Sequence, residues 1–127
     1  DLYPQSVYAD SANRLIETLE NKIVEKDFKT CMLYYKMEEY QAAITSFERF
    51  LKENPTTTHR EEIINYMVLT YAKYAEKSVL EKQRERYELA LEKYNTLTYM
   101  YPDSKYITEL EPTVEKIRTE LSNIKTK

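Results

Sequence analysis

Glycine is absent from all 127 residues of this chain. Phosphate-binding loops, tight active-site turns and many sheets depend on glycine, because it adopts backbone conformations that other residues avoid. The single cysteine excludes an internal disulfide. The single histidine and the four aspartates leave few ligands and bases for a metal site or a catalytic triad. These shortages predict a protein that is not an enzyme and that holds no cofactor and no metal.

Long apolar runs and a basic stripe are also missing. No apolar stretch approaches the roughly 18 residues that a membrane-spanning helix requires. The 19 basic and 22 acidic side chains are interspersed and give a net charge of −3, which argues against a nucleic-acid groove. Hydrophobic residues make up 42% of the chain and charged residues 32%, as is typical of an all-helical protein. We therefore expect protein partners and no nucleic acid.

Residues 27–55 have the spacing of a tetratricopeptide repeat, in which a short turn joins two antiparallel helices. Small residues let these helices approach closely, and rings fill the space between neighbouring pairs. The positions that match the pattern are Cys31, Tyr34, Ala43, Phe47 and Pro55. Asp27 and Thr30 replace the tryptophan and leucine of the pattern. This departure predicts a first helix unlike that of an average repeat.

A second partner helix repeats the spacing of the first. The set Tyr40, Ala43, Phe47 and Pro55 returns at the same intervals as Tyr87, Ala90, Tyr94 and Pro102. Two copies of this spacing predict an all-α fold, with tetratricopeptide hairpins stacked as a short right-handed solenoid that has a long first helix. We expect one domain over residues 1–127, with repeat units over 6–55 and 56–102 and a C-terminal capping helix over 103–125.

The first helix is expected to be unusually long. No proline or glycine interrupts residues 6–37. The apolar residues of the first half keep helical spacing on one face: Ala12, Leu15, Ile16, Leu19 and Ile23. After residue 27 the apolar pattern resumes with a shifted phase, so the two halves face different neighbours. One helix of about 31 residues would be about 46 Å long; a break near Asn21 is the alternative.

Three further helices are expected between the first helix and the C-terminal capping helix. They cover residues 40–54, about 58–76 and 84–101, and the capping helix follows. Its apolar residues lie on one face, and Glu, Lys, Thr and Arg occupy the other, as in the terminal helix of a solenoid. Pro112 is expected to kink it.

The connection between the third and fourth helices is longer than a standard turn. Tyr87 follows Tyr71 by 16 positions, whereas Tyr40 follows Tyr34 by 6, so ten residues are inserted. We expect residues 77–84 to protrude as an inter-helix insertion.

The side chains that could take part in a reaction also have structural explanations. Cys31 occupies a position for a small buried side chain and is expected to pack rather than react. His59 lies in a Thr-rich turn and is expected to be a solvated residue at a helix start. Glu61 and Glu62 suit the positive end of a helix dipole. Most of the thirteen tyrosines lie at helical spacings and are expected to be packing residues.

The N-terminal half resembles a particular family. The residues that carry the resemblance are YPQSVYADSANRLI at 3–16, YYKMEEYQAAI at 34–44 and FLKENP at 50–55. They are similar to the BamD family, the tetratricopeptide lipoproteins of the bacterial outer-membrane β-barrel assembly machinery. A looser likeness continues to Tyr106. The resemblance implies a continuous first helix.

The resemblance also implies a function and a location. It implies a non-catalytic scaffold on the periplasmic face of the outer membrane, which binds protein subunits of the β-barrel assembly complex and so supports insertion of β-barrel proteins. The chain would be the C-terminal half of a lipoprotein, touching the membrane only through a lipid anchor that this fragment does not contain. Cys31 lies mid-helix and is not the lipidated cysteine. The alternative is a generic tetratricopeptide adaptor that binds a peptide segment in its concave groove.

The apolar stripe on the first helix is the candidate interaction surface. Ala12, Leu15, Ile16, Leu19 and Ile23 lie ahead of the point where their own repeat begins. In a solenoid each repeat buries one face on the previous repeat. We expect these residues to form either a surface that binds a partner protein or the surface on which a repeat missing from this fragment would pack. We also predict truncation-driven self-association through residues 8–24, because an exposed patch of this size drives association.

Overall fold

The computed structural model describes residues 3–126 of the chain. They form five α-helices in the order α1 (Tyr3–Lys36), α2 (Tyr40–Glu53), α3 (Arg60–Glu76), α4 (Leu80–Met100) and α5 (Lys105–Thr126). No strand occurs in this described part. The prediction of an all-α, tetratricopeptide-like fold is therefore confirmed.

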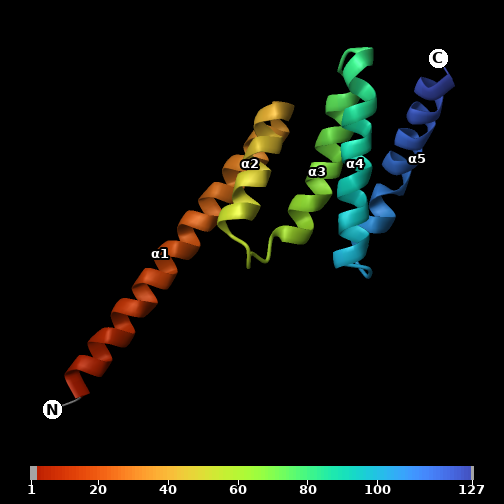
Figure 1. Ribbon diagram of the computed structural model, residues 1–127. Helices are drawn as coiled ribbons and strands as arrows, with labels where there is room; N and C mark the ends of the chain where they lie inside the picture. Colours follow the sequence, from red (N-terminus) through yellow and green to blue (C-terminus); the bar gives the residue numbers. More distant parts are fainter. Residues whose placement is uncertain (1–2, 127) are drawn as a thin grey trace.

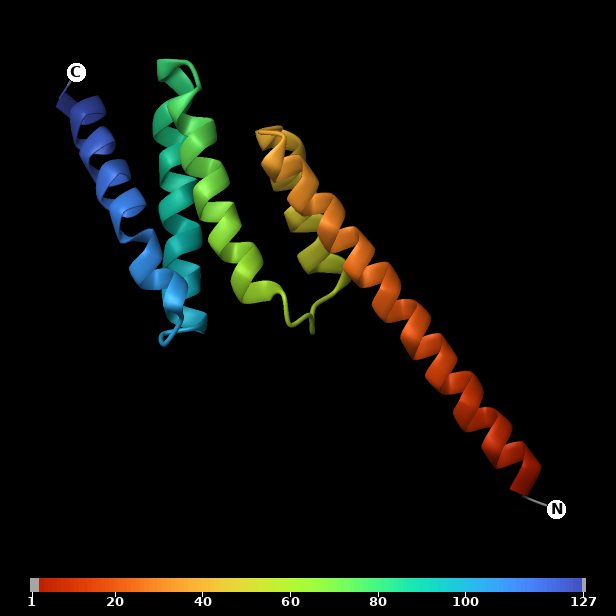
Figure 2. The same cartoon turned by 180° about the vertical axis from the view of Figure 1, so that it is seen from behind.

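Each helix packs on its neighbours along the chain. α1 packs on α2, α2 on α3 and α3 on α4, and α5 contacts both α3 and α4. Figures 1 and 2 show α3, α4 and α5 side by side, whereas the first half of α1 extends away from the other helices. We call this projecting first half of α1 the arm, and the rest of the described chain the body.

α1 is one unbroken helix of 34 residues. The prediction of a long first helix is confirmed, and the alternative break near Asn21 is wrong. The helix begins three residues earlier than expected, so that Pro4 lies in its first turn. Proline is tolerated there because the first N–H groups of a helix have no partner within it.

The positions of the repeat pattern lie at the centre of the core. Ala43 and Ala90 are 0% exposed and leave room for neighbouring helices to approach closely. One hydrophobic cluster contains side chains from all five helices, among them Cys31, Phe47, Met67, Tyr87 and Ile117. Burial of each large apolar side chain contributes about 1.5 to 3 kcal/mol. This shared core fixes the base of the arm to the body.

The predicted protruding insertion at residues 77–84 is wrong. Only residues 77–79 form the turn, and α4 begins at Leu80. α3 continues five residues past Tyr71, whereas α1 continues two residues past Tyr34. α4 begins seven residues before Tyr87, while α2 begins at its own repeat tyrosine. The additional residues therefore lengthen the α3–α4 hairpin at both helix ends, and none of them loops out.

Polar contacts hold the ends of the two hairpins together. The Lys77 ammonium lies 3.6 Å from the Glu38 carboxylate, which joins the α3–α4 turn to the α1–α2 turn. Within the longer hairpin, the Arg86 guanidinium lies 3.8 Å from the centre of the Tyr74 ring and donates a hydrogen bond to the Ser78 hydroxyl. Cation–π contacts of this kind contribute about 0.5 to 1 kcal/mol at exposed sites.

The α1–α2 turn covers residues 37–39. Glu38 has φ 60° and is the one residue with positive φ in the described chain. This left-handed region favours glycine, and other residues lose about 1 to 2 kcal/mol there. In a chain without glycine, a glutamate occupies the position.

The remaining helix ends lie close to their predicted positions. α2 ends at Glu53, and α3 begins two residues after the expected start at Thr58. At the start of α5, the Ser104 hydroxyl accepts a hydrogen bond from the Tyr106 N–H at 3.2 Å, as expected of a capping serine. α5 continues through Pro112 as a single helix.

Candidate functional site

The five residues of the predicted stripe all lie on the arm. The side chains of Leu15, Ile16, Leu19 and Ile23 are between 49% and 60% exposed. Ala12 is also exposed, and none of the five belongs to a hydrophobic cluster of the described chain. We call Ala12, Leu15, Ile16, Leu19 and Ile23 together the outer face of α1.

α1 has two apolar faces that point in different directions. In its second half, Val24, Phe28, Cys31 and Tyr35 pack into the core. At about 100° of rotation per residue, the mean direction of these four lies about 130° from that of the outer face. Because α1 is a continuous helix, the outer face and the packed face keep different directions along its whole length.

The arm is polar on the side that continues the packed face. Asp10, Asn13 and Glu17 lie on that side, and all three are exposed. Polarity therefore reverses along α1: the side that is buried in the second half is hydrophilic in the arm. The pattern does not favour folding of the arm back onto the body.

Two kinds of residue that the sequence analysis did not single out adjoin the outer face. Leu33 is 55% exposed and points about 55° from the mean direction of the outer face, beyond the polar residues Lys26 and Thr30. Lys22, Lys26 and Lys29 follow one border of the outer face at intervals of four and three residues, and all are exposed. Their heptad-like spacing was the signal that could have identified them.

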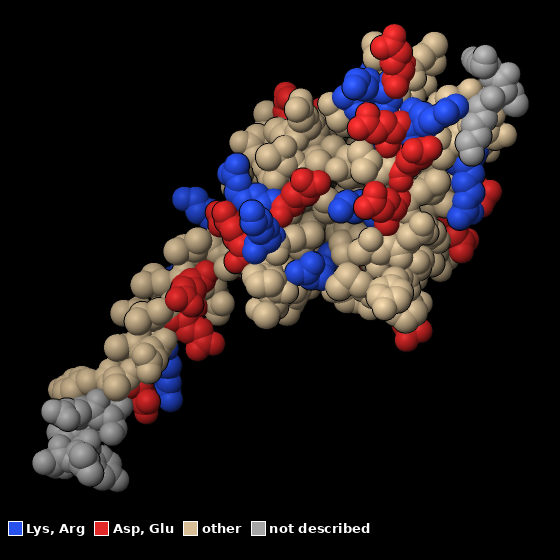
Figure 3. All heavy atoms as spheres, in the orientation of Figure 1, with Lys and Arg blue, Asp and Glu red and all other residues tan. Residues whose placement is uncertain are grey.

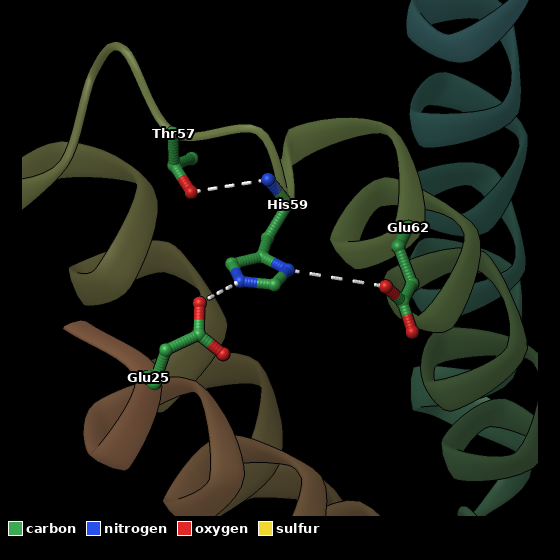
Figure 4. Close-up of polar contacts among 4 residues, drawn as sticks. All are labelled: Glu25, Thr57, His59 and Glu62. Atoms are coloured by element: carbon green, nitrogen blue, oxygen red, sulfur yellow. Dashed lines mark hydrogen bonds and ion pairs between the residues drawn. The ribbon is translucent and has the colours of Figure 1, made fainter. Parts of the chain in front are cut away.

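His59 joins α3 to the base of the arm. Its ring stacks on Phe28 of α1, with centroids 4.1 Å apart and planes 9° apart. Its Nε2 atom lies 2.6 Å from the Glu25 carboxylate, and Figure 4 shows Glu25 and Glu62 on opposite sides of the ring. The Phe50 ring of α2 lies at 6.3 Å. One side chain thus contacts three helices.

The prediction that His59 is solvated is wrong. Its side chain is only 19% exposed, because Phe28 and Phe50 cover it. The backbone N–H of His59 also donates to the Thr57 hydroxyl at 3.1 Å, which orders the loop that precedes α3. His59 is therefore a junction residue that helps to set the direction of the arm.

The single thiol has the environment of a packing residue. Cys31 is buried, and burial raises its pKa to about 11, with a smaller contribution from the Asp27 carboxylate. A thiol with such a pKa is protonated at neutral pH and is a poor nucleophile. Burial likewise raises the pKa of Tyr71, whose hydroxyl donates to the Glu48 carboxylate at 3.2 Å.

The described residues offer no constellation for metal chemistry. Residues 3–126 contain no group of three His, Cys, Asp or Glu side chains placed to hold an ion. No helix in the same range combines the length and the apolar character that a membrane span requires. Figure 3 shows acidic and basic side chains intermixed on the visible face of the body.

These features define an all-α, tetratricopeptide-like protein with a projecting, apolar-faced arm. The YfiO family, described as outer membrane lipoprotein, matches residues 1–84 and, in an overlapping match, residues 28–126. The chain therefore belongs to this family, which places it at the periplasmic face of the outer membrane. The resemblance identified from the sequence is confirmed.

One similar protein is the outer membrane protein assembly factor BamD of Vibrio cholerae serotype O1. It is 26% identical to this chain over 87 residues. The match covers 68% of this chain and 36% of that relative, so the chain corresponds to little more than a third of the relative's length.

Proposed function

We propose that this protein is a non-catalytic scaffold of the outer-membrane protein assembly complex. In this role it binds partner subunits on the periplasmic side and so supports insertion of β-barrel proteins. Membership of the outer membrane lipoprotein family supports this role, as does similarity to a protein named an assembly factor. The observation that carries the proposal is the exposed outer face of α1 on an arm whose base is fixed in the core.

The outer face has the properties of a docking surface. Its apolar side chains form a contiguous patch of several hundred Å², the size at which exposed patches mark interaction sites. The Phe28–His59 stack and the shared core hold the base of the arm in one direction. A surface that is already ordered loses less conformational entropy on binding, which favours affinity.

The alternative of a peptide-binding adaptor has less support. A carboxylate clamp would require several basic side chains in the hollow that receives the peptide. The hollow between α1 and α2, with a volume of about 220 Å³, contains Arg49 together with Asp27 and Glu53. A larger hollow of about 550 Å³ between α1 and the loop that precedes α3 is lined by Glu25 and Glu53 and by no lysine or arginine. The acidic side chains offset the attraction of either hollow for a peptide carboxylate.

Isothermal titration calorimetry tests the proposed function. The purified chain is titrated with the soluble periplasmic domain of each subunit of the assembly complex, beginning with the barrel-inserting subunit. We expect saturable binding to at least one subunit. A Leu15→Glu, Leu19→Glu variant should lose that binding, whereas an Asn13→Glu, Asn21→Glu variant, with equal charge added to other sides of the arm, should retain it. A chain that binds no subunit would contradict the proposal.

A further inference from the structure

Polar side chains gather where α3 packs on α5. Asn65 lies one turn before Leu69 and two turns before Ala72 on one side of α3. Leu69 and Ala72 line a hollow together with Thr113 and Ile117 of α5. Asn65 therefore lies on the side of α3 that faces α5, where it is only 6% exposed.

The Asn65 amide is largely buried without a partner. None of the side-chain hydrogen bonds within residues 3–126 involves it. By contrast, Thr70, which is also buried, donates to the Tyr66 carbonyl at 2.6 Å. A buried amide without a partner destabilises a protein, so its presence calls for an explanation. Water or a hydrogen-bonding group of a ligand reaches this amide only through its narrow exposure.

Two half-buried tyrosines and three carboxylates lie in the same region. Together with Asn65 they form what we call the seam: Glu61, Glu62, Asn65 and Tyr66 of α3, with Tyr106 and Glu109 of α5. Burial raises the pKa of Tyr66, and the carboxylates of Glu62 and Glu109 raise it further. Burial raises the pKa of Tyr106 as well, with additional contributions from Glu62, Tyr66, Glu61 and Glu109. The acidic groups of both helices therefore converge on the two rings.

The carboxylates of the seam have little positive charge to pair with. Among the described residues, Glu61 and Glu109 form no ion pair, and the partner of Glu62 is His59 at 4.0 Å. The helix dipole accounts for Glu61 and Glu62 in the first turn of α3. It accounts neither for Glu109, which lies beyond the first turn of α5, nor for the Asn65 amide.

Basic side chains adjacent to the seam in the sequence are directed elsewhere. The Lys105 ammonium lies 5.2 Å from the centre of the Tyr106 ring, and Arg60 donates to the Pro55 carbonyl at 2.9 Å. Neither forms an ion pair in the described part of the chain. The next basic residue of α3, Lys73, lies about 10 Å further along the helix than the seam.

The seam combines the groups that bind a guanidinium. Carboxylates accept its paired N–H donors, an amide oxygen accepts another, and a tyrosine ring stacks on its plane. The ammonium of a lysine is a compact charge that neither stacks nor bonds in this paired manner. A metal ion is less suited, because residues 3–126 contain no three His, Cys, Asp or Glu side chains placed to hold one.

We infer that the seam binds an arginine side chain that a partner protein presents. The carboxylates supply the opposite charge, the Asn65 amide oxygen accepts a hydrogen bond, and the Tyr66 ring packs against the guanidinium. The Tyr66 ring lies 4.9 Å from that of Tyr35, and Tyr106 packs against the buried cluster between α3 and α5. Both rings are thus ordered before binding, which favours affinity. This inference rests on the proposed function and adds a partner chemistry at a surface separate from the outer face of α1.

A titration with blocked amino acids tests the inference. N-acetyl-arginine methylamide is added to the isotope-labelled chain, and two-dimensional NMR follows the side-chain amide of Asn65. We expect its resonances to shift saturably. The citrulline derivative, which keeps the shape but not the charge, should bind at least about tenfold more weakly, the sum of three surface charge pairs. The lysine derivative should also bind more weakly than the arginine derivative.

Two variants with equal loss of charge provide the control. Glu62→Gln, Glu109→Gln should weaken binding of the arginine derivative at least about threefold, whereas Glu88→Gln, Glu111→Gln, at exposed positions outside the seam, should leave it unchanged. Circular dichroism verifies that both variants are folded. Equal affinity of the parent chain for the arginine and citrulline derivatives would overturn the inference, as would tighter binding of spermidine, which would assign the seam to a polyamine.

Calorimetry with the assembly subunits separates this inference from the proposed function. A subunit that presents the arginine should bind the Glu62→Gln, Glu109→Gln variant at least about threefold more weakly than the parent. Subunit binding that these substitutions leave unchanged would overturn the inference, while the proposed function would stand. Saturable binding of the arginine derivative without binding of any subunit would reject the proposed function and leave the seam as an arginine site.

Discussion

The imidazole ring of His59 lies flat against the ring of Phe28, with the two centroids 4.1 Å apart. Phe28 belongs to α1, and His59 immediately precedes α3. The pair therefore connects the helix that carries the exposed surface to the second hairpin. The Glu25 carboxylate adds a polar contact to the same ring at 2.6 Å.

Removal of either ring should destabilise the junction. Phe28 is half-buried, so we expect Phe28→Ala to lower the free energy of unfolding by about 2 to 3 kcal/mol, near the lower end for a phenylalanine. His59→Ala should cost about 1 kcal/mol, from the lost stack and hydrogen bond. Urea denaturation measures both values. Thr58→Ala, at an exposed neighbouring position, is the control; equal effects of all three substitutions would refute the role of the stack.

Glu38→Gly should stabilise the protein. Glu38 has φ 60°, which glycine adopts without steric cost, and the expected gain is about 0.5 to 1 kcal/mol after loss of the Lys77 ion pair. Glu39 has φ −85°, so Glu39→Gly should instead destabilise slightly. Thermal denaturation of the two variants compares them directly. The same sign of change in both would show that backbone strain at Glu38 is unimportant.

Cys31 should behave as a structural residue. Cys31→Ser should fold and lose about 1 to 3 kcal/mol, because a hydroxyl replaces a buried thiol. Alkylation of native Cys31 by iodoacetamide should be slow at neutral pH. Rapid labelling under native conditions would contradict this assignment.

The raised pKa of Cys31 also predicts a pH dependence. Folding favours the neutral thiol, since burial raises its pKa from 9.0 to about 11. Its contribution to stability is therefore complete below pH 9.0 and disappears as the pH rises towards about 11. Denaturation at a series of alkaline pH values should show a smaller decline for Cys31→Ser than for the parent. Identical declines would indicate that other groups, such as Tyr71, dominate.

Deletion of residues 77–84 should be disruptive. The segment contains the α3–α4 turn and the beginning of α4, and its loss would remove the positions that bring Arg86 over Tyr74. We expect a loss of about 3 kcal/mol or more and a fall in helicity. Insertion of Gly-Ser within residues 77–79 is the contrasting variant and should cost less than about 1 kcal/mol, since loop length is inexpensive. A deletion variant with parental stability would restore the interpretation of this segment as a loop.

The repeat spacing predicted the hairpins because close helix packing restricts residue size. Ala43 and Ala90 are fully buried where only a small side chain fits, and this restriction is visible in the sequence. The start of α4 had no such restriction. Leu80 is 69% exposed and the residues after it are mostly solvated, so no apolar period indicated a helix. The signal that remained was composition, because Leu, Glu, Lys, Gln and Arg are all strong helix formers.

The site was predictable only in part for a related reason. The apolar spacing of Leu15, Leu19 and Ile23 is a local pattern, and it identified the outer face. The burial of His59 depends on Phe28, which is 31 positions away in the sequence, so no local pattern could indicate it. Lysines such as Lys22 are common on helix surfaces, and only the structure shows that they lie beside an exposed apolar face.

Sedimentation velocity, from micromolar to near-millimolar concentration, tests most directly the claim that the outer face of α1 is a docking surface. Without a partner, the apolar contacts should drive weak self-association of the chain at the higher concentrations. The Leu15→Glu, Leu19→Glu variant should remain monomeric, and the Asn13→Glu, Asn21→Glu variant should associate as the parent does. A parent chain that stays strictly monomeric throughout, or association that persists in the Leu15→Glu, Leu19→Glu variant, would contradict the claim.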